Sequence, residues 1–377
     1  MEPRMSKTSN TSDASKDGTA SQPGEATPKA SPRDPVAIDL GLQGGGSHGA
    51  FTWGVLDRLL EESWLEIDAI SGTSAGAMNA TALVAGYQQG GRDGARAALE
   101  RFWSAVARAA LLSPLRRGPL DILLGRWSLD SSPAFLAMDM MARLVSPYDI
   151  HLTGGNPLNA VLAETIDFGR LAHARQRLYV TATNVRTGRG RVFRNAEVTP
   201  EALMASACLP TLFRAVEIDG EAYWDGGYAG NPTITPLVRD GGSADDLLLV
   251  AINPVDRPGT PRSATEIQNR LNEISFNATI IKELRMIALL QQVVAESPAK
   301  LDSRRVEGAR WASFRVHLLS SPVMIDLGYS SKLNAEWEFL TFLRDEGRRT
   351  AERFLAENGD KIGRRSSADL NKLLEGV

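Results

Sequence analysis

Residues 67–80, "IDAISGTSAGAMNA", join an apolar run to a stretch of small residues through Ser74, which stands between Gly72 and Gly76. The apolar run predicts a buried strand, and the stretch after the serine predicts a helix. A serine on a sharp strand-to-helix turn is exposed at the carboxyl end of a sheet, and flanking glycines let the turned backbone approach its neighbours. The segment therefore indicates Ser74 as a candidate nucleophile, with a buried structural serine in the same turn as the alternative.

The elements around this segment continue the alternation of strand and helix. Residues 36–42, "VAIDLGL", predict a buried strand, and residues 52–62, "TWGVLDRLLEE", have the apolar spacing of a helix. Two strands and two helices in this order, within about 50 residues, predict a right-handed parallel βαβ unit. Further elements are expected as strands at residues 178–185, 246–254 and 314–321 and as helices at 263–296 and 333–359. The expected fold class is α/β.

The first 35 residues differ in composition from the rest of the chain. They contain no Val, Ile, Leu, Phe, Trp or Tyr, so they cannot bury enough apolar surface to offset the entropy cost of ordering, and we expect a disordered tail. They also lack the apolar core of a secretory signal. The expected organisation is a tail over residues 1–35, a catalytic domain over 36–245, and the C-terminal part of the same domain, with a helical extension, over 246–377.

Composition excludes several classes of protein. The formal net charge of −3 provides no general positive field, so no nucleic-acid partner is expected. The single cysteine, Cys208, excludes an internal disulfide and a cysteine-based zinc site, and no His, Asp and Glu cluster has metal-ligand spacing. No apolar run reaches the ~18 residues of a membrane span. We therefore expect a cytoplasmic protein that needs no metal and no cofactor.

A glycine-rich segment, "QGGGSHG" at residues 43–49, follows the first predicted strand. Consecutive backbone N–H groups at Gly44, Gly45 and Gly46 would form an anion-binding nest, which suits the oxyanion of acyl transfer. Gly44, Gly46 and Gly49 also fit the G-x-G-x-x-G pattern of dinucleotide sites. Such a site needs an acidic residue at the end of the second strand. Here that strand ends at the candidate nucleophile, so an oxyanion role is favoured.

The histidines are poor candidates for the base that a nucleophilic serine needs. His48 lies inside the glycine-rich segment, but no carboxylate that would orient it is evident. His151, His173 and His317 lie in segments that favour surface or packing roles. The base is therefore sought among the carboxylates.

Asp225, in "YWDGGYAGNP", is the best candidate for this base. It follows a hairpin predicted at residues 219–220, Asp-Gly, and it directly precedes Gly226 and Gly227. A carboxylate can act as a general base toward serine when burial raises its pKa toward the working pH. An aspartate that only caps its own turn is the alternative.

These motifs together resemble the patatin-like phospholipase family. "GGGSHGAF" at residues 44–51 resembles its glycine-rich oxyanion segment, and "GTSAG" at 72–76 resembles its nucleophile elbow. "DGG" at 225–227 resembles its Asp-Gly-Gly motif, and "ASACLP" at 205–210 resembles a further family block. All four occur in the family's order across residues 36–236. The resemblance implies a three-layer α/β/α fold with a mainly parallel central sheet and added helices.

The resemblance also implies the roles of individual residues. A Ser–Asp dyad falls on Ser74 and Asp225, and the oxyanion donors fall on the backbone of Gly44, Gly45 and Gly46. The residues expected to support these motifs are Gly49, Gly72, Gly76, Gly226, Gly227 and His48. Family members often carry Arg or Lys where His48 stands, and a histidine would supply that charge only when protonated.

The expected activity is hydrolysis of fatty-acyl esters of phospholipids or lysophospholipids through an acyl-enzyme. A neutral acylglycerol or short-chain ester is the second substrate class, and a non-catalytic dinucleotide-binding or scaffold protein is a further alternative. Residues 111–127 and 134–145 mix apolar and basic side chains. They are expected to form an acyl groove, a membrane-facing cap or ordinary core helices. Transient peripheral contact with a membrane would suffice for activity at a lipid surface.

Overall fold

A computed structural model describes residues 33–111, 113–149, 156–296 and 306–373. Of the expected tail, only the last three residues fall within these ranges. His151 lies outside them. The residues from Asp34 onward form one compact unit. Among the described helices, none combines the length and the apolar character that a membrane span requires.

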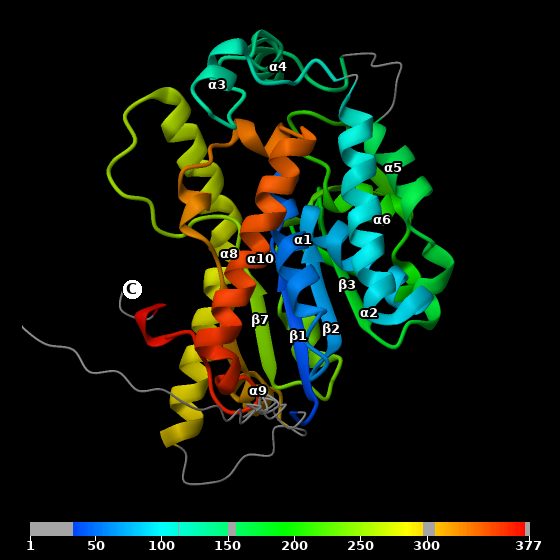
Figure 1. Cartoon of the computed structure of the whole chain (residues 1–377), viewed down its shortest axis with the longest axis vertical. Coiled ribbons are helices and arrows are strands. Elements are labelled where there is room, and N and C mark those ends of the chain that lie inside the picture. The colour runs from blue at the N-terminus through cyan, green and yellow to red at the C-terminus, as the bar shows by residue number, and fades with distance from the viewer. Residues whose placement is uncertain (1–32, 112, 150–155, 297–305, 374–377) are drawn as a thin grey trace, which may run out of the picture. The chain divides into compact units, whose positions relative to one another are not determined.

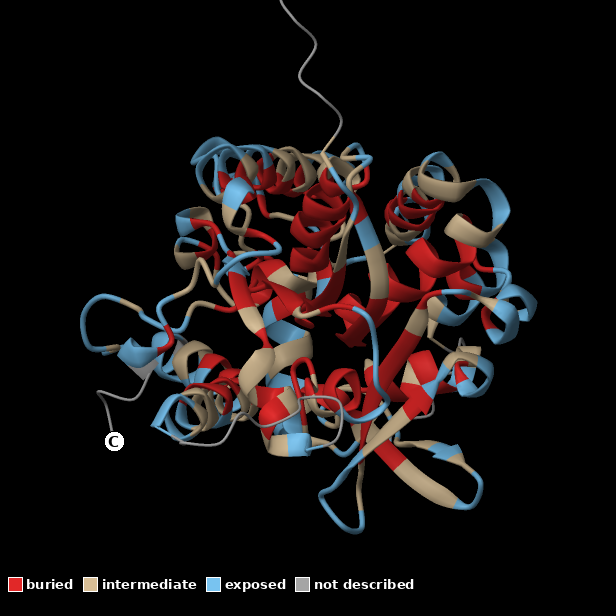
Figure 2. Cartoon of the chain, turned by 90° about the horizontal axis from the view of Figure 1, so that it is seen from below, coloured by how far each residue is buried: buried red, intermediate tan, exposed pale blue. Residues whose placement is uncertain are grey.

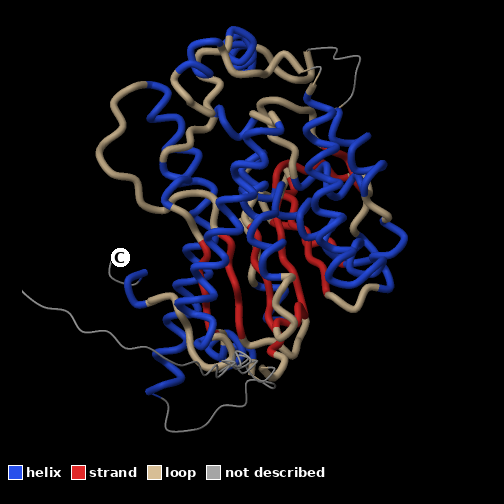
Figure 3. Tube along the Cα trace, viewed as in Figure 1, coloured by secondary structure: helices blue, strands red, loops and turns tan. Residues whose placement is uncertain are grey.

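The described strands form one mixed sheet in the order β5-β6-β3-β2-β1-β7-β8, with β4 paired to β3 (Figures 1 and 3). Its parallel strands are β1 Val36–Leu42, β2 Leu65–Thr73, β3 Arg177–Asn184, β7 Asp246–Val250 and β8 Arg315–Leu319. The antiparallel strands are β4 Gly190–Arg194, β5 Val216–Ile218 and β6 Glu221–Asp225. The expected strand at 246–254 ends earlier, at Val250, because the amides of Ile252 and Asn253 donate to the Gln43 side chain instead of to a neighbouring strand.

Helices cover both faces of the sheet. One side carries α1 Gly49–Leu59, α2 Ala75–Ala110, α5 Pro157–Thr165, α6 Pro200–Ser206 and α10 Trp337–Asn358. The other carries α7 Thr235–Arg239, α8 Ala264–Glu296 and α9 Glu307–Ser313. Two short helices, α3 Pro119–Leu123 and α4 Pro133–Leu144, lie beyond the carboxyl ends of the central strands (top of Figure 1).

The core is divided between the two faces of the sheet, as Figure 2 shows by burial. Side chains of a strand alternate between faces. In β7, Leu248 and Val250 pack into the cluster with α1, α2 and α10, while Leu247 and Leu249 pack into the cluster with α7 and α8. Because both faces of the strand are buried under helices, the fold is the expected three-layer α/β/α arrangement.

Helices α1 and α10 cross at unusually close range. A Cβ atom on Gly54 would overlap the carbonyl oxygen of Arg344, and one on Gly347 would overlap the carbonyl oxygen of Phe51. Only residues without a side chain allow the two backbones to approach so closely. This crossing fixes α1, which begins directly after the glycine-rich segment.

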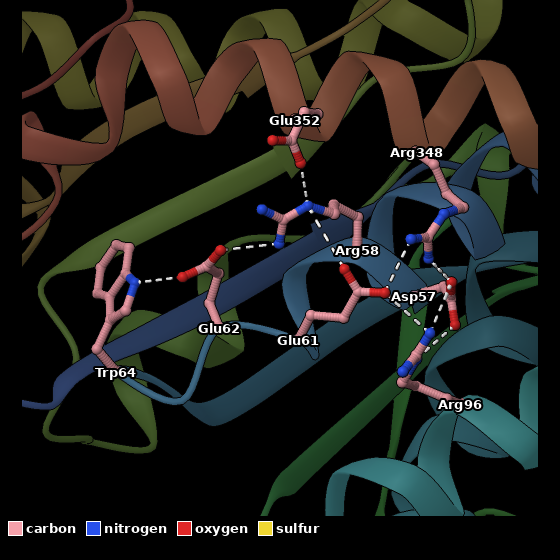
Figure 4. Close-up of polar contacts among 8 residues, drawn as sticks. All are labelled: Asp57, Arg58, Glu61, Glu62, Trp64, Arg96, Arg348 and Glu352. Atoms are coloured by element: carbon pink, nitrogen blue, oxygen red, sulfur yellow. Dashed lines mark hydrogen bonds and ion pairs between the residues drawn. The ribbon is translucent and has the colours of Figure 1, made fainter. Parts of the chain in front are cut away.

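Ion pairs also join α10 and α2 to the C-terminal end of α1 (Figure 4). Arg348 of α10 pairs with Asp57 of α1 and with Glu61 in the turn after α1, and Arg96 of α2 contacts the same two carboxylates. Such partly exposed pairs each contribute about 0–1 kcal/mol. The close packing at the glycines therefore matters more for the position of α1 than these charges do.

Candidate active site

Ser74 occupies a strained turn between β2 and α2. Its backbone angles are φ 53° and ψ −122°, a region that residues with side chains rarely adopt. Its N–H donates to the Ser206 hydroxyl over 2.9 Å. A Cβ on Gly72 would overlap the backbone of Gly76, and a Cβ on Gly76 would overlap the carbonyl oxygen of Leu42. The elbow thus requires both of its glycines, as expected from the motif.

Asp225 ends β6 and lies beside the serine. The Ser74 side chain lies close enough to this carboxylate to lower its pKa. The Gly227 N–H donates to Asp225 Oδ1 over 2.7 Å. Asp225 is only 1% exposed, and this burial raises its pKa to about 7, although the Gly227 hydrogen bond, the Ser74 hydroxyl and the charge of Lys332 oppose the rise. The structure therefore brings the two members of the expected dyad together.

The glycines after Asp225 are required by close packing. A Cβ on Gly226 would overlap the carbonyl oxygen of Thr181, and a Cβ on Gly227 would overlap the ring of Phe276 from α8. The two glycines after Asp225 therefore allow the turn to pack closely between β3 and α8. This position directs the Asp225 side chain back toward the serine.

The three expected oxyanion donors are not equivalent. The Gly44 N–H donates to the Asn231 Oδ1 over 2.6 Å, so this amide is already engaged. The described residues supply no acceptor for the amide N–H groups of Gly45 and Gly46. Both of these glycines line the same cavity as Ser74. Of these three amides, those of Gly45 and Gly46 are therefore available to an anion in the cavity.

His48 and Gly49, the last two residues of the glycine-rich segment, fix it to neighbouring elements. His48 is buried and its Nε2 lies 2.8 Å from the Ser331 hydroxyl. That hydroxyl donates to the Gly328 carbonyl, so it accepts from His48, whose ring is neutral. Burial, and then the charge of Lys332, lower the pKa of His48 well below its ordinary value. His48 is therefore neither the charged residue that family members often carry nor a base. A Cβ on Gly49 would lie 2.7 Å from the Ala75 Cβ, which ties the segment to α2.

Lys332 is a residue of this site that the sequence analysis missed. It lies in a 3₁₀ turn, Ser330–Leu333, and lines the cavity together with Ser74 and Asp225. Its Nζ donates to the Asn253 Oδ1 over 2.8 Å. No motif surrounds it in the sequence. The one available signal was indirect, namely a histidine at position 48 where the family often has a cation.

The cavity in front of the dyad has a volume of about 460 Å³. Volumes of this order are usual for sites that bind small organic ligands. Its walls are mostly apolar and include Met78, Phe102, Trp103, Leu158, Leu212 and Phe213. Such a lining suits a hydrocarbon chain. The described residues contain no group of three His, Cys, Asp or Glu side chains placed to hold a metal ion.

A serine, a histidine and an aspartate also lie together at another place in the fold. His317 contacts the Ser367 hydroxyl through Nδ1 at 3.0 Å and Asp246 through Nε2 at 2.9 Å. Asp246 begins β7, so this group lies at the opposite end of the strands from Ser74, and His317 is fully buried. None of the three lines the cavity in front of Ser74. The arrangement fastens residues 363–368 to the sheet. His173 is exposed, as expected.

A family model for patatin-like phospholipase matches residues 40–238, which is more than half of the chain. The chain therefore belongs to the patatin-like phospholipase family, a family of lipid acyl hydrolases. The matched region contains the glycine-rich segment, Ser74 and Asp225, but it ends well before Lys332.

Two similar proteins illustrate how far the likeness extends. The protein YjjU of Escherichia coli (strain K12) is 25% identical over 290 residues, which cover 72% of this chain and 68% of YjjU. The crystal structure of VipD from Legionella pneumophila is 14% identical, with a TM-score of 0.34. That match covers 86% of this chain and 67% of VipD.

Proposed function

We propose that this chain hydrolyses fatty-acyl esters of phospholipids or lysophospholipids, with Ser74 as the nucleophile and Asp225 as the general base. One observation carries the proposal. A serine at a strained elbow lies beside a buried carboxylate, and both line the same largely apolar cavity. A decayed site in a scaffold protein would have no reason to keep this combination.

The geometry supports a two-step reaction. Asp225 accepts the proton of the Ser74 hydroxyl as Oγ attacks the ester carbonyl carbon, and the carbonyl oxygen becomes negative. The N–H groups of Gly45 and Gly46 donate to that oxygen. Collapse of the intermediate breaks the ester bond, and the proton on Asp225 passes to the departing alcohol. A water molecule then gives a proton to Asp225 and attacks the acyl-enzyme, which releases the fatty acid and restores the Ser74 hydroxyl.

The mouth of the cavity supports docking on a lipid surface. Helix α4 lines the mouth through Asp139 and Arg143. It also exposes apolar side chains to solvent, with Leu136 54%, Met140 58% and Leu144 75% exposed. In the neighbouring α3, Leu123 is 82% exposed. Both helices are thus not ordinary core helices, since most of their large apolar side chains are exposed. Exposed apolar clusters of this kind mark interaction surfaces.

A phospholipid fits the charges at the site better than a neutral lipid does. Lys332 lines the cavity and can oppose a phosphate, whereas the charge of Arg143 is balanced by its ion pair with Asp139 over 2.8 Å. The apolar walls themselves would accept the acyl chain of either class. Neutral acylglycerols therefore remain the second candidate, and head-group preference is to be measured with mixed lipids.

Labelling with a fluorophosphonate probe tests the nucleophile directly. The wild-type protein should react, whereas Ser74→Ala should not, because the probe bonds to an activated serine oxygen. Asp225→Asn should slow the reaction by a factor of about 10² or more, since the base is lost. Ser367→Ala is the matched control, because Ser367 lies beside His317, which is a potential base; this variant should react like the wild type.

Two outcomes would contradict the proposal. One is undiminished labelling or ester hydrolysis in Ser74→Ala. The other is a wild-type protein that neither reacts with the probe nor releases fatty acid from phospholipid vesicles.

A further inference from the structure

The turn that carries Lys332 packs directly on the oxyanion segment. Gly46, with φ +58°, sits so close to the Lys332 backbone that a Cβ there would overlap the lysine's carbonyl oxygen. The neighbouring Ser331 accepts the His48 hydrogen bond. Two successive residues of this C-terminal turn thus contact two residues of the glycine-rich segment.

Asn253 links the lysine ammonium to the same segment from another direction. It follows β7, accepts from Lys332 Nζ through Oδ1 at 2.8 Å, and donates through Nδ2 to the Gly44 carbonyl at 2.9 Å. The Gln43 side chain accepts from the Asn253 backbone N–H over 3.0 Å. The ammonium is therefore held in one place beside the donors at Gly45 and Gly46, rather than left free to sample solvent.

The charged groups around the Lys332 ammonium leave it free to interact with Asp225. The charged and titratable groups that face it are Asp225 from β6, Glu273 from α8, Arg257 from the loop after β7, and His48 from the glycine-rich segment. Glu273 is already engaged by Arg257 over 2.6 Å, and His48 is neutral. Asp225 is thus the anion near Lys332 that has no cation of its own among the described residues.

We propose that Lys332 is the active-site cation, whose ammonium keeps Asp225 ionised and opposes the negative charge that develops on the oxyanion at Gly45 and Gly46. The proposal rests on the proposed function of the Ser74–Asp225 dyad. It assigns to the C-terminal part of the chain the charge that many family members carry next to their glycines. Lys332 acts on the reaction electrostatically, so it is a positioning residue and takes no proton from the substrate.

The physical reason is the order in which charge moves. Before attack the negative charge resides on the buried Asp225, and in the transition state it moves to the oxyanion. A cation beside both positions favours the ionised base first and the oxyanion next. In a site with little water, one such charge has a large effect on the barrier. Burial lowers the pKa of Lys332 itself to about 8, although Asp225 and Glu273 oppose the shift.

The test compares Lys332→Gln, Lys332→Met and Lys332→Arg by their pH profiles. Glutamine keeps a donor for Asn253 without the charge, and methionine removes both. We expect kcat/KM of both neutral variants to fall by a factor of about 10² at neutral pH, with KM for a short-chain ester changed little. Their acid limb should move to higher pH, since Asp225 has lost the cation that lowers its pKa.

The alkaline limb of the pH–activity profile distinguishes an electrostatic role of Lys332 from a structural one. Wild-type activity should decline as pH rises through about 8, where Lys332 loses its proton. Lys332→Arg should keep activity and carry this decline to higher pH, because a guanidinium stays charged. Lys361→Met is the matched control, since Lys361 also donates to an asparagine oxygen, over 2.7 Å, but at the end of α10. It should keep the wild-type profile.

Neutral variants with unchanged limbs, or an arginine variant as weak as methionine, would overturn the role of Lys332. Thermal unfolding of each variant separates these results from misfolding, because a purely structural role would lower the melting temperature without moving either limb. A wild-type protein that does not react with the fluorophosphonate would instead overturn the dyad. Failure of the dyad and failure of Lys332 are thus different results.

Discussion

Asp225 combines two properties that oppose each other at the scale of a single residue. Burial suits the carboxylate to the proposed role of taking a proton from Ser74, because its pKa lies at about 7 rather than at its ordinary 3.8. The same burial makes the ionised form unfavourable in the folded state. Activity and stability therefore depend on pH in opposite directions through this one group.

The sign follows from proton binding. Between pH 3.8 and about 7 the unfolded carboxylate is ionised while the folded one keeps its proton. Stability from this group thus falls as pH rises through that interval, whereas kcat/KM rises toward and above pH 7. We expect Asp225→Asn to be inactive but to melt at a higher temperature than the wild type at pH 8, with a smaller difference at pH 4.

Calorimetry of both proteins at the two pH values measures this effect. The asparagine Oδ1 can still accept from Gly227, so the turn should persist. An Asp225→Asn variant that is less stable than the wild type at pH 8 would show that the carboxylate is favourably ionised in the folded protein.

At the scale of elements, the close crossing of α1 and α10 positions residues of the candidate site, although the glycines at the crossing do not line the cavity. Helix α1 continues directly from the oxyanion segment, and α10 follows the turn that carries Lys332. Holding the two helices together through Gly54 and Gly347 therefore also holds the two halves of the site together.

Gly347→Ala should lower stability by about 1–3 kcal/mol, since its methyl group would overlap the Phe51 carbonyl and force the helices apart. Activity should fall as well, because the start of α1 would move. The matched control is Gly359→Ala. Gly359 has helical angles and a Cβ there would meet no atom within 4 Å, so this variant should be near neutral.

Urea denaturation gives the stability difference, and a short-chain ester assay gives the activity. Equal midpoints for the two alanine variants would mean that the crossing adapts to an extra methyl group at little cost.

At the scale of the whole molecule, the expected membrane contact depends on the exposed side chains of α4. Leu136→Glu combined with Leu144→Glu should reduce binding to phospholipid vesicles and hydrolysis of their lipids at least tenfold. Hydrolysis of a soluble short-chain ester should remain unchanged, because neither leucine lines the cavity. The loss follows from removing exposed apolar area that would leave water on docking.

Leu289→Glu is the control for this surface. Leu289 is 52% exposed, like Leu136, but it lies in the second half of α8. Vesicle sedimentation and fatty-acid release should match the wild type. Equal losses from the α8 and α4 variants would show that general surface hydrophobicity, and not the mouth of the cavity, drives binding.

The fold, and the position of Asp225 beside Ser74, were predictable because local patterns encode them. Apolar runs predicted the parallel strands, and the glycines around Ser74 and after Asp225 predicted tight turns that the packing requires. Lys332 and Asn253 could not be found in this way. They reach the site through the pairing of β7 beside β1 and through α10, and such long-range pairing leaves no mark in the sequence near either residue. The engagement of Gly44 by Asn231 was unpredictable for the same reason.

The contact between the turn at Lys332 and the glycine-rich segment has a consequence during synthesis. The ribosome makes Ser74 and its glycines early and Lys332 late, with more than two hundred residues between them. A nascent chain thus carries the nucleophile long before it carries the proposed cation and the helix that clamps α1. If the proposed role of Lys332 holds, a nascent chain would become active only after this turn and α10 have left the ribosome and folded onto the glycine-rich segment.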